Sequence, residues 1–159
     1  MIRTRLLLFA LLLAACGGGQ SGPAPEPGPA TPDAAIRRFL QAASDSNLPA
    51  MANIWGTEKG SAGRTGQPPD YLKRMQVTQL YLQHVPYKVV RIQPYEDDPR
   101  RQQVDVQFDR GSCQRTVPII VVRTDKDGWI INQLDLTKVG APNRPCKDAT
   151  EAPPAPAKP

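Results

Sequence analysis

The side chains that could carry chemistry are few in this sequence of 159 residues, which contains a single histidine. A catalytic triad or a histidine–aspartate dyad would have to be built on that residue, His84. Nothing near His84 in the sequence marks a nucleophile that it would activate. We therefore expect His84 to end a helix or to pack at an interface, and the sequence does not predict an enzyme.

Two loops contain residue types that elsewhere hold ions or phosphates. Asp125-Lys126-Asp127-Gly128 has the opening spacing of a calcium loop, but the third acidic ligand and the distant glutamate are absent. Residues 56–66 are rich in glycine, yet no Gly-Lys-Ser/Thr motif follows and no strand precedes them. We expect a plain hairpin turn at 125–128, a mobile surface loop over 56–67, and neither a metal nor a cofactor.

The N-terminus has the pattern of an export signal. Arg3 and Arg5 form a basic start, and residues 6–15 then run without a charged side chain. Ten apolar residues in a helix span about 15 Å, which is roughly half the hydrocarbon thickness of a bilayer. The segment is therefore too short for a permanent membrane span.

The end of this segment, Leu13-Ala14-Ala15-Cys16, resembles the lipobox of bacterial lipoproteins. The resemblance implies that the Cys16 thiol receives a diacylglyceryl group, that residues 1–15 are removed, and that the lipid holds the protein to a membrane. An ordinary secretory signal with an incidental cysteine is the alternative. Gly17 is not the aspartate that resembles an inner-membrane retention signal in enteric bacteria. The expected location is thus the cell envelope, the outer membrane being favoured where there are two.

Cysteine usage agrees with export. Once Cys16 is lipidated, Cys113 and Cys146 remain as an even pair in an oxidising compartment. A disulfide between them would close a loop of about 34 residues, worth roughly 3–4 kcal/mol in the chain-entropy model. A metal pair is the weaker alternative, because only His84 would help and a structural zinc site requires four ligands.

Composition divides the mature chain into a tether, one domain and a tail. Residues 17–32 hold five glycines and five prolines, so we expect a disordered tether over 16–32. Residues 33–147 suffice for one domain, and the Pro/Ala-rich residues 148–159 form a second disordered segment. The net charge of +5 includes Arg3 and Arg5, and the remaining basic pairs are scattered. A nucleic-acid partner is therefore not expected.

Hydrophobic periodicity predicts helices followed by strands. Thr31 and Asn47 are suited to cap two helices, and a third helix is expected from Pro69-Asp70 to about Gln83. From residue 85 the period changes to two, which predicts four antiparallel strands. Pro118 has no amide donor, so we expect it at an edge or a bulge. The predicted strands cover 87–93, 103–108, 117–122 and 129–136. The fold class is α+β, with the N-terminal helices packed on a curved antiparallel sheet.

The order of these elements resembles the NTF2-like superfamily, and most closely its small lipoprotein domains of unknown function. The resemblance rests on apolar spacing over residues 32–139, including Phe39-Leu40, Met51 and Trp55-Gly56. A cystatin-like or other helix-on-sheet fold is the runner-up. The resemblance implies a cone around an apolar pocket. Six side chains are its expected lining, although the same six would also suit an ordinary core: Phe39, Trp55, Tyr71, Met75, Phe108 and Trp129.

Some enzymes of that superfamily, such as steroid isomerases, place an aspartate base opposite a tyrosine in the cone. Strand alternation puts Asp105 with Gln103 and Gln107 on the solvent side. Asp135 falls on the face of Trp129 and Ile131, which makes it the one carboxylate to inspect, with Tyr71, Tyr81 or Tyr87 as its partner.

The sequence thus favours a membrane-anchored, non-catalytic binding or interaction domain that meets a small apolar ligand or an envelope protein. A pocket enzyme of the isomerase or hydrolase type and a purely structural envelope component are the alternatives.

Overall fold

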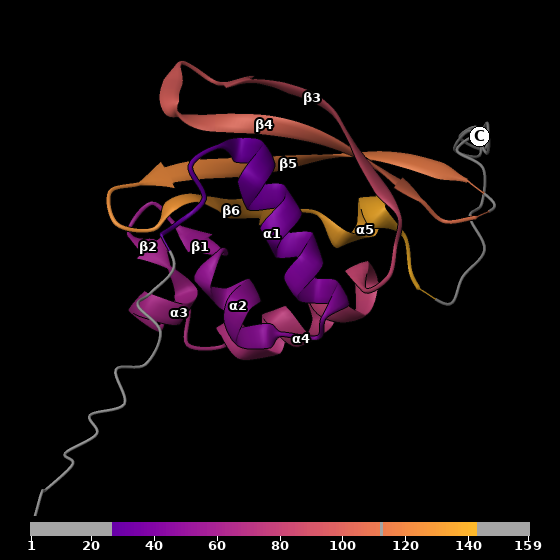
Figure 1. Cartoon of the computed structure of the whole chain (residues 1–159), viewed down its shortest axis with the longest axis horizontal. Coiled ribbons are helices and arrows are strands. Elements are labelled where there is room, and N and C mark those ends of the chain that lie inside the picture. Colours follow the sequence, from indigo (N-terminus) through magenta and orange to yellow (C-terminus); the bar gives the residue numbers. More distant parts are fainter. Residues whose placement is uncertain (1–26, 112, 143–159) are drawn as a thin grey trace, which may run out of the picture.

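A four-stranded antiparallel sheet in the order β3-β4-β5-β6 forms one layer of the domain, and the helices gather on one side of it (Figure 1). The computed structural model describes residues 27–111 and 113–142. The α+β class and the four antiparallel strands are confirmed. The strands are β3 (Tyr87–Tyr95), β4 (Asp98–Asp109), β5 (Gln114–Thr124) and β6 (Gly128–Leu134). The longer helices are α1 (Pro32–Ser44), α2 (Leu48–Asn53) and α4 (Tyr71–Leu82).

Both predicted helix caps are present. The side chain of Thr31 accepts a hydrogen bond from the amide of Ala34 at 3.1 Å, and Asn47 accepts one from the amide of Ala50 at 3.0 Å. Each bond satisfies an amide that has no partner within its own helix. The two caps fix where α1 and α2 begin.

The expectation of a mobile loop over 56–67 is wrong. This segment forms a short hairpin of β1 (Gly56–Thr57) and β2 (Gly60–Ser61), followed by α3 (Ala62–Thr65). Asp127, in the turn between β5 and β6, accepts a hydrogen bond from the Ser61 amide at 2.8 Å. The glycines provide conformations that other residues rarely adopt, as at Gly60 with φ of 131°. The hairpin is therefore held by a long-range contact that local composition does not reveal.

The predicted tether ends earlier than expected, because its last residues belong to the fold. Pro29 is buried, and its carbonyl accepts a hydrogen bond from the Trp129 amide at 2.9 Å. The guanidinium of Arg38 donates to the carbonyl of Pro27 at 2.9 Å. Segment 27–31 thus lies against α1 and the start of β6, and the domain boundary at 33 was placed too late.

Alternation along the strands produces the core. Val104, Val106 and Phe108 of β4 point to one face, as predicted, and are fully buried. They pack with α1, α2 and α4 side chains and with alternate residues of β5 and β6. Pro118 of β5 pairs with Asp105 of β4 on one side. On the other side, the pairing of β5 with β6 begins only at the next residue, Ile119. Pro118 therefore lies where β5 is locally an edge, as expected.

A bulge in β6 changes which residues share a face. Ile120 pairs with Gln133, but the next β5 residue, Val121, pairs with Ile131, so Asn132 is the extra residue. The strand ends at Leu134, and Asp135 caps the short helix α5 (Leu136–Val139). The prediction that the last strand runs to 136 is thus wrong.

Several predictions concern segments outside the described residues. The export signal, the lipobox with Cys16 and most of the tether precede residue 27. Cys146 and the predicted tail follow residue 142. Cys113 lies just before β5, and its pairing with Cys146 stays a prediction.

Candidate functional site

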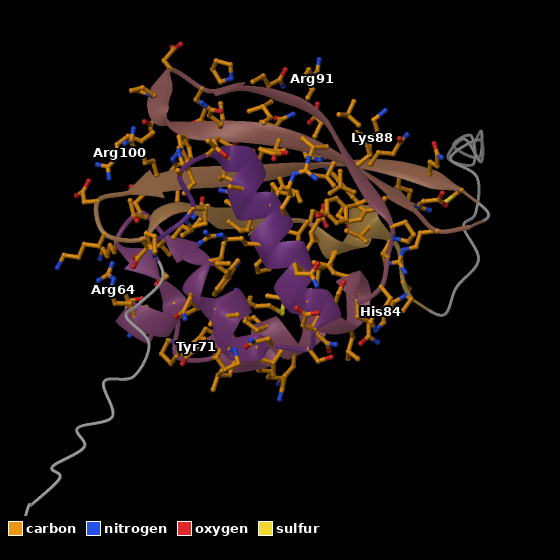
Figure 2. The ribbon with its side chains drawn as sticks, viewed as in Figure 1. Arg64, Tyr71, His84, Lys88, Arg91 and Arg100 are labelled. Carbon is orange, nitrogen blue, oxygen red and sulfur yellow. The ribbon has the colours of Figure 1, made fainter. Side chains whose placement is uncertain are left out.

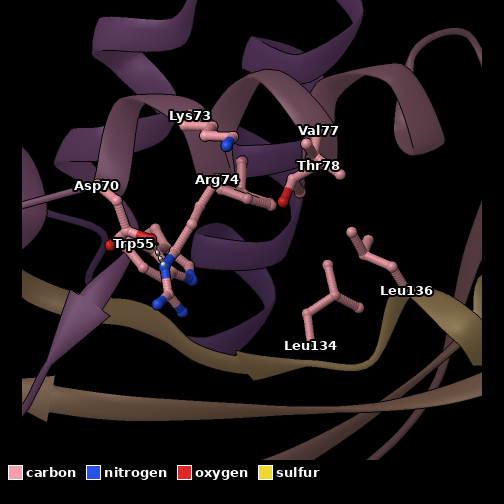
Figure 3. A pocket seen from close by; sticks show the side chains of 9 residues that line it. Trp55, Asp70, Lys73, Arg74, Val77, Thr78, Leu134 and Leu136 are labelled. Carbon is pink, nitrogen blue, oxygen red and sulfur yellow. Dashed lines mark hydrogen bonds and ion pairs between the residues drawn. The ribbon is translucent and has the colours of Figure 1, made fainter. Parts of the chain in front are cut away.

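A pocket of about 390 Å³ lies between α4 and the junction of β6 with α5 (Figure 3). Its apolar walls come from elements that are far apart in the sequence: Phe39 on α1, Trp55 after α2, Val77 on α4, and Leu134 and Leu136 at the junction. Pockets that hold small ligands range from about 300 to 1,000 Å³ and have mainly apolar walls with a few polar groups. In size and character this pocket belongs to that class.

The polar groups of the pocket all belong to one face of α4. Asp70, Lys73, Arg74 and Thr78 line it together with Val77. Their spacing follows the helical repeat, since residues three and four apart are neighbours on a helix surface. Met75 and Leu82 of α4 belong to the core, and Thr78 is adjacent to both on the helix surface. Packing of Met75 and Leu82 thus fixes the helix and places Thr78 at the border between the core and the pocket.

The charges on this face are not equivalent. The Arg74 guanidinium donates from Nε to Asp70 Oδ2 at 3.0 Å, one helical turn away. Among the described residues, the Lys73 ammonium has no such partner. Figure 3 shows Arg74 reaching down beside Trp55, while Lys73 lies higher on the helix. With Asp70 and Arg74 compensating each other, the pocket carries one net positive charge, that of Lys73.

Thr78 is the polar group most enclosed by the pocket. Its residue is only 8 % exposed, and its hydroxyl points from α4 toward the space above Leu134 and Leu136 (Figure 3). No hydrogen bond to this hydroxyl is made within the described part of the chain. The hydroxyl oxygen is not itself among the buried atoms of the described residues that lack a partner, so a water molecule or a ligand atom in the pocket can complete its hydrogen bond.

A second, more polar cavity of about 630 Å³ adjoins the first. Trp55 and Arg74 line both, so these two side chains form the wall between them. The second cavity lies under the β1–β2 hairpin, where Glu58 forms an ion pair with Arg101 of β4. Glu58 and Arg101 are thus engaged with each other, whereas the Lys59 ammonium, which also lines this cavity, has no ion pair among the described residues.

The structure separates the six predicted lining residues. Phe39 and Trp55 line the pocket between α4 and the β6–α5 junction. Met75 and Phe108 are fully buried, and Trp129 is 7 % exposed, all within the core. Tyr71 is half-buried against the same core. Met75, Phe108 and Trp129 therefore fill the interior that they were expected to surround, Tyr71 lies at its edge (Figure 2), and the pocket lies beside that interior.

The carboxylates differ from expectation as well. Asp135 does not share a face with Trp129 and Ile131, because the bulge at Asn132 intervenes. Its carboxylate is exposed and accepts hydrogen bonds from the Thr137 hydroxyl at 2.6 Å and the Thr137 amide at 2.9 Å. These bonds lower the pKa of Asp135 below its ordinary value. An ionised carboxylate occupied in capping α5 is poorly suited to be a base in a pocket.

Asp105 was expected on the solvent side, yet it is only 6 % exposed. Arg91 of β3 donates to it at 2.7 and 3.0 Å, and Gln103 donates at 2.7 Å. Burial by itself raises the pKa of this carboxyl, but the hydrogen bonds and the charge of Arg91 outweigh burial, and the pKa is lowered. The long side chains cover the aspartate, which alternation alone does not predict.

The other candidate catalytic residues do not converge. His84 is exposed and follows the end of α4 with a positive φ of 57°, as expected of a helix-end residue. Tyr81 and Tyr87 are half-buried against the core, away from the pocket. Asp127 is engaged by Arg64 and Ser61, so the 125–128 segment is a hairpin turn with Gly128 at φ of 66°.

Within 27–111 and 113–142, no group of three or more His, Cys, Asp or Glu residues is arranged to hold a metal ion. The same part of the chain contains no helix long and apolar enough to cross a membrane.

Sequence reasoning missed most of the pocket. It assigned Lys73 and Arg74 to scattered surface charge and did not consider Val77, Thr78, Leu134 or Leu136. The available signal was a second face of α4 at positions 70, 73, 74, 77 and 78, which mixes charged, hydroxyl and aliphatic residues.

Comparison with protein-family models, with curated proteins and with solved structures finds no match to this chain.

Proposed function

We propose that this protein is a lipid-anchored envelope protein whose domain is a non-catalytic binding module, with the pocket between α4 and the β6–α5 junction as its ligand site. One observation carries the binding proposal: the Thr78 hydroxyl has no hydrogen-bond partner among the described residues and points into an apolar-walled pocket of about 390 Å³. Such a group is typical of a site whose hydrogen bond is completed by a ligand.

The anchor rests on the sequence. Leu13-Ala14-Ala15-Cys16 follows a basic start and a short apolar segment, as in bacterial lipoproteins. Ten residues lie between Cys16 and Pro27, the first described residue, and the eleven steps along the extended chain reach about 34 Å at ~3.1 Å per residue. The domain would then be displayed close to the membrane that holds the lipid.

The NTF2-like assignment belongs to this proposal, with one modification. Three helices and a four-stranded antiparallel sheet support it, but the interior is filled by Met75, Phe108 and Trp129. The ligand site would then lie at the side of the filled interior, bounded by α4. The enzyme alternative is less well supported, because Asp135 caps a helix outside the pocket.

The anchor is tested in a bacterial host by processing and phase partition. We expect the wild-type chain to be shortened and to enter the detergent phase, and the Cys16→Ala chain to remain uncleaved and unlipidated. Cys113→Ala is the control, because it alters a cysteine outside the motif. Equal processing and partition of the wild type and Cys16→Ala would refute the lipid anchor.

The pocket is tested by native mass spectrometry on the full mature chain purified from cells. We expect a small-molecule adduct that disappears in Val77→Trp, where the larger ring occupies the pocket. Leu80→Trp is the matched control: Leu80 is exposed on the same helix and does not line the pocket. An adduct that persists in Val77→Trp, or a bare mass in every sample, would exclude this pocket as the ligand site.

A further inference from the structure

We infer that the pocket selects a single-chain anionic amphiphile, whose acyl chain lies on Val77, Leu134 and Leu136 and whose carboxylate meets Lys73 and Thr78. This inference rests on the proposed function and adds the class of ligand to it. It follows from three properties of the pocket: its charge, its one free hydroxyl, and the size of its apolar part.

The charge of the pocket favours an anion. Asp70 and Arg74 form an ion pair at 3.0 Å, whereas Lys73 has no partner among the described residues. A carboxylate near Lys73 forms a charge-assisted hydrogen bond, which is stronger than a neutral one. A cationic head group in the same place is repelled by Lys73, whose charge is the uncompensated one, so the pocket discriminates by sign of charge.

The Thr78 hydroxyl adds a donor one helical turn from Arg74 and five residues from Lys73. Residues 73 and 78 both line the pocket, with Thr78 on the buried side of α4 and Lys73 at the exposed rim, so hydroxyl and ammonium border the same space. A carboxylate has acceptor sites on both oxygens and accepts from both donors at once. A neutral alcohol satisfies Thr78 and leaves the ammonium without a counter-charge.

Size favours a single short chain. The pocket volume of about 390 Å³ lies near the lower end of the range for small-ligand sites. Decanoate, with ten carbons and two oxygens, is a probe of this size class, and a lipid with two long chains is much larger. Five apolar side chains line the space available to the hydrocarbon chain: Phe39, Trp55, Val77, Leu134 and Leu136.

The experiment compares three ten-carbon probes by titration calorimetry on the full mature chain carrying Cys16→Ser. The probes are decanoate, decan-1-ol and decyltrimethylammonium, all below their micelle concentrations. We expect decanoate to bind about tenfold more tightly than the alcohol, as a charge-assisted hydrogen bond implies, and the cation to bind most weakly. Equal affinity for decanoate and decyltrimethylammonium would overturn the inference.

Variants then locate the head group. We expect Lys73→Gln to weaken decanoate binding about tenfold and to leave decan-1-ol binding unchanged. Thr78→Val keeps the shape and removes the hydroxyl, and it should weaken both probes. Lys88→Gln, an exposed lysine on β3 that does not line the pocket, should bind as the wild type does. Thermal unfolding midpoints verify that each variant is folded.

Failure of the inference differs from failure of the proposed function. If decanoate does not bind but native mass spectrometry shows an adduct that Val77→Trp removes, the pocket binds another class of molecule and only the inference is wrong. If decanoate does not bind and no adduct is found, both are wrong. Equal decanoate affinity in Lys73→Gln and Lys88→Gln would remove Lys73 from the site and refute the assigned head-group position.

Discussion

Arg64 and Asp127, 63 residues apart in the sequence, are joined by three hydrogen bonds. Arg64 Nε donates to both carboxylate oxygens at 3.0 and 3.1 Å, and Nη2 donates to Oδ2 at 2.8 Å. The same carboxylate accepts from the Ser61 amide at 2.8 Å. These bonds lower the pKa of Asp127, the hydrogen bonds from Arg64 being the largest cause. The turn between β5 and β6 thereby holds the β1–β2 hairpin and α3 in place.

Removing this carboxylate should destabilise the domain. In Asp127→Ala the amide of Ser61, a residue only 2 % exposed, loses its acceptor, and an unsatisfied buried donor costs about 1–3 kcal/mol. The free energy of unfolding is measured by urea denaturation. Asp125→Ala, which alters a side chain 90 % exposed two residues away, should have a much smaller effect. Equal losses in the two variants would contradict the role assigned to Asp127.

Stability should fall in acid partly because of Asp105. The pKa of this carboxyl in the folded protein lies below its ordinary value of 3.8, so protonation is more favourable in the unfolded chain. The stabilisation is therefore present above pH 3.8 and is lost as the pH falls through the lower folded value. Urea denaturation between about pH 5 and pH 2.5 measures it. Asp105→Asn and Arg91→Gln should both reduce the fall of the free energy of unfolding with decreasing pH. An unchanged pH dependence in Asp105→Asn would show that Asp105 does not cause that fall.

Filling of the interior is tested at Met75. This side chain is fully buried, so Met75→Ala should lower the free energy of unfolding by about 2–5 kcal/mol through lost burial and the cavity that remains. Leu72→Ala on the same helix removes a side chain from a residue that is 50 % exposed and should cost much less. If Met75 lined an open pocket instead, the two substitutions would have similar effects.

The segment before α1 should contribute to stability. A mature chain lacking residues 27–30 loses the buried Pro29 and its hydrogen bond to the Trp129 amide. Leaving that amide without its acceptor costs about 1 kcal/mol or more. Chemical denaturation of chains with and without these residues measures the difference. Deletion of residues 17–20, which lie farther from the domain along the sequence, is the control. Equal stability of all three chains would show that residues 27–30 do not stabilise the fold.

The Cys113–Cys146 disulfide remains a prediction of the sequence. Intact mass measured without reductant should lie two units below the reduced value if the bridge forms. Reduction, or Cys113→Ser with Cys146→Ser, should then lower the free energy of unfolding by about 3–4 kcal/mol. The double variant is compared with Ser112→Ala as a neighbouring control. Two free thiols in protein prepared from an oxidising compartment would show the prediction to be wrong.

The sequence by itself determined the elements and the class of fold. Helix caps, as at Thr31 and Asn47, and strand alternation, as at Val104 and Val106, depend on residues within a few positions of one another. Such signals can be recognised without knowing the tertiary structure. The lipobox is predicted from a contiguous motif of the same local kind, Leu13-Ala14-Ala15-Cys16, and stays a prediction.

Only the tertiary structure decided where the pocket lies and which residues fill the interior. The bulge at Asn132 depends on how β6 pairs with β5, and it moved Asp135 out of the face assigned to it. The site joins Thr78 on α4 with Leu134 and Leu136, more than fifty residues later. Apolar spacing shows that a residue is buried, but it does not distinguish a filled core from a pocket wall. That distinction depends on how side chains from distant segments pack together.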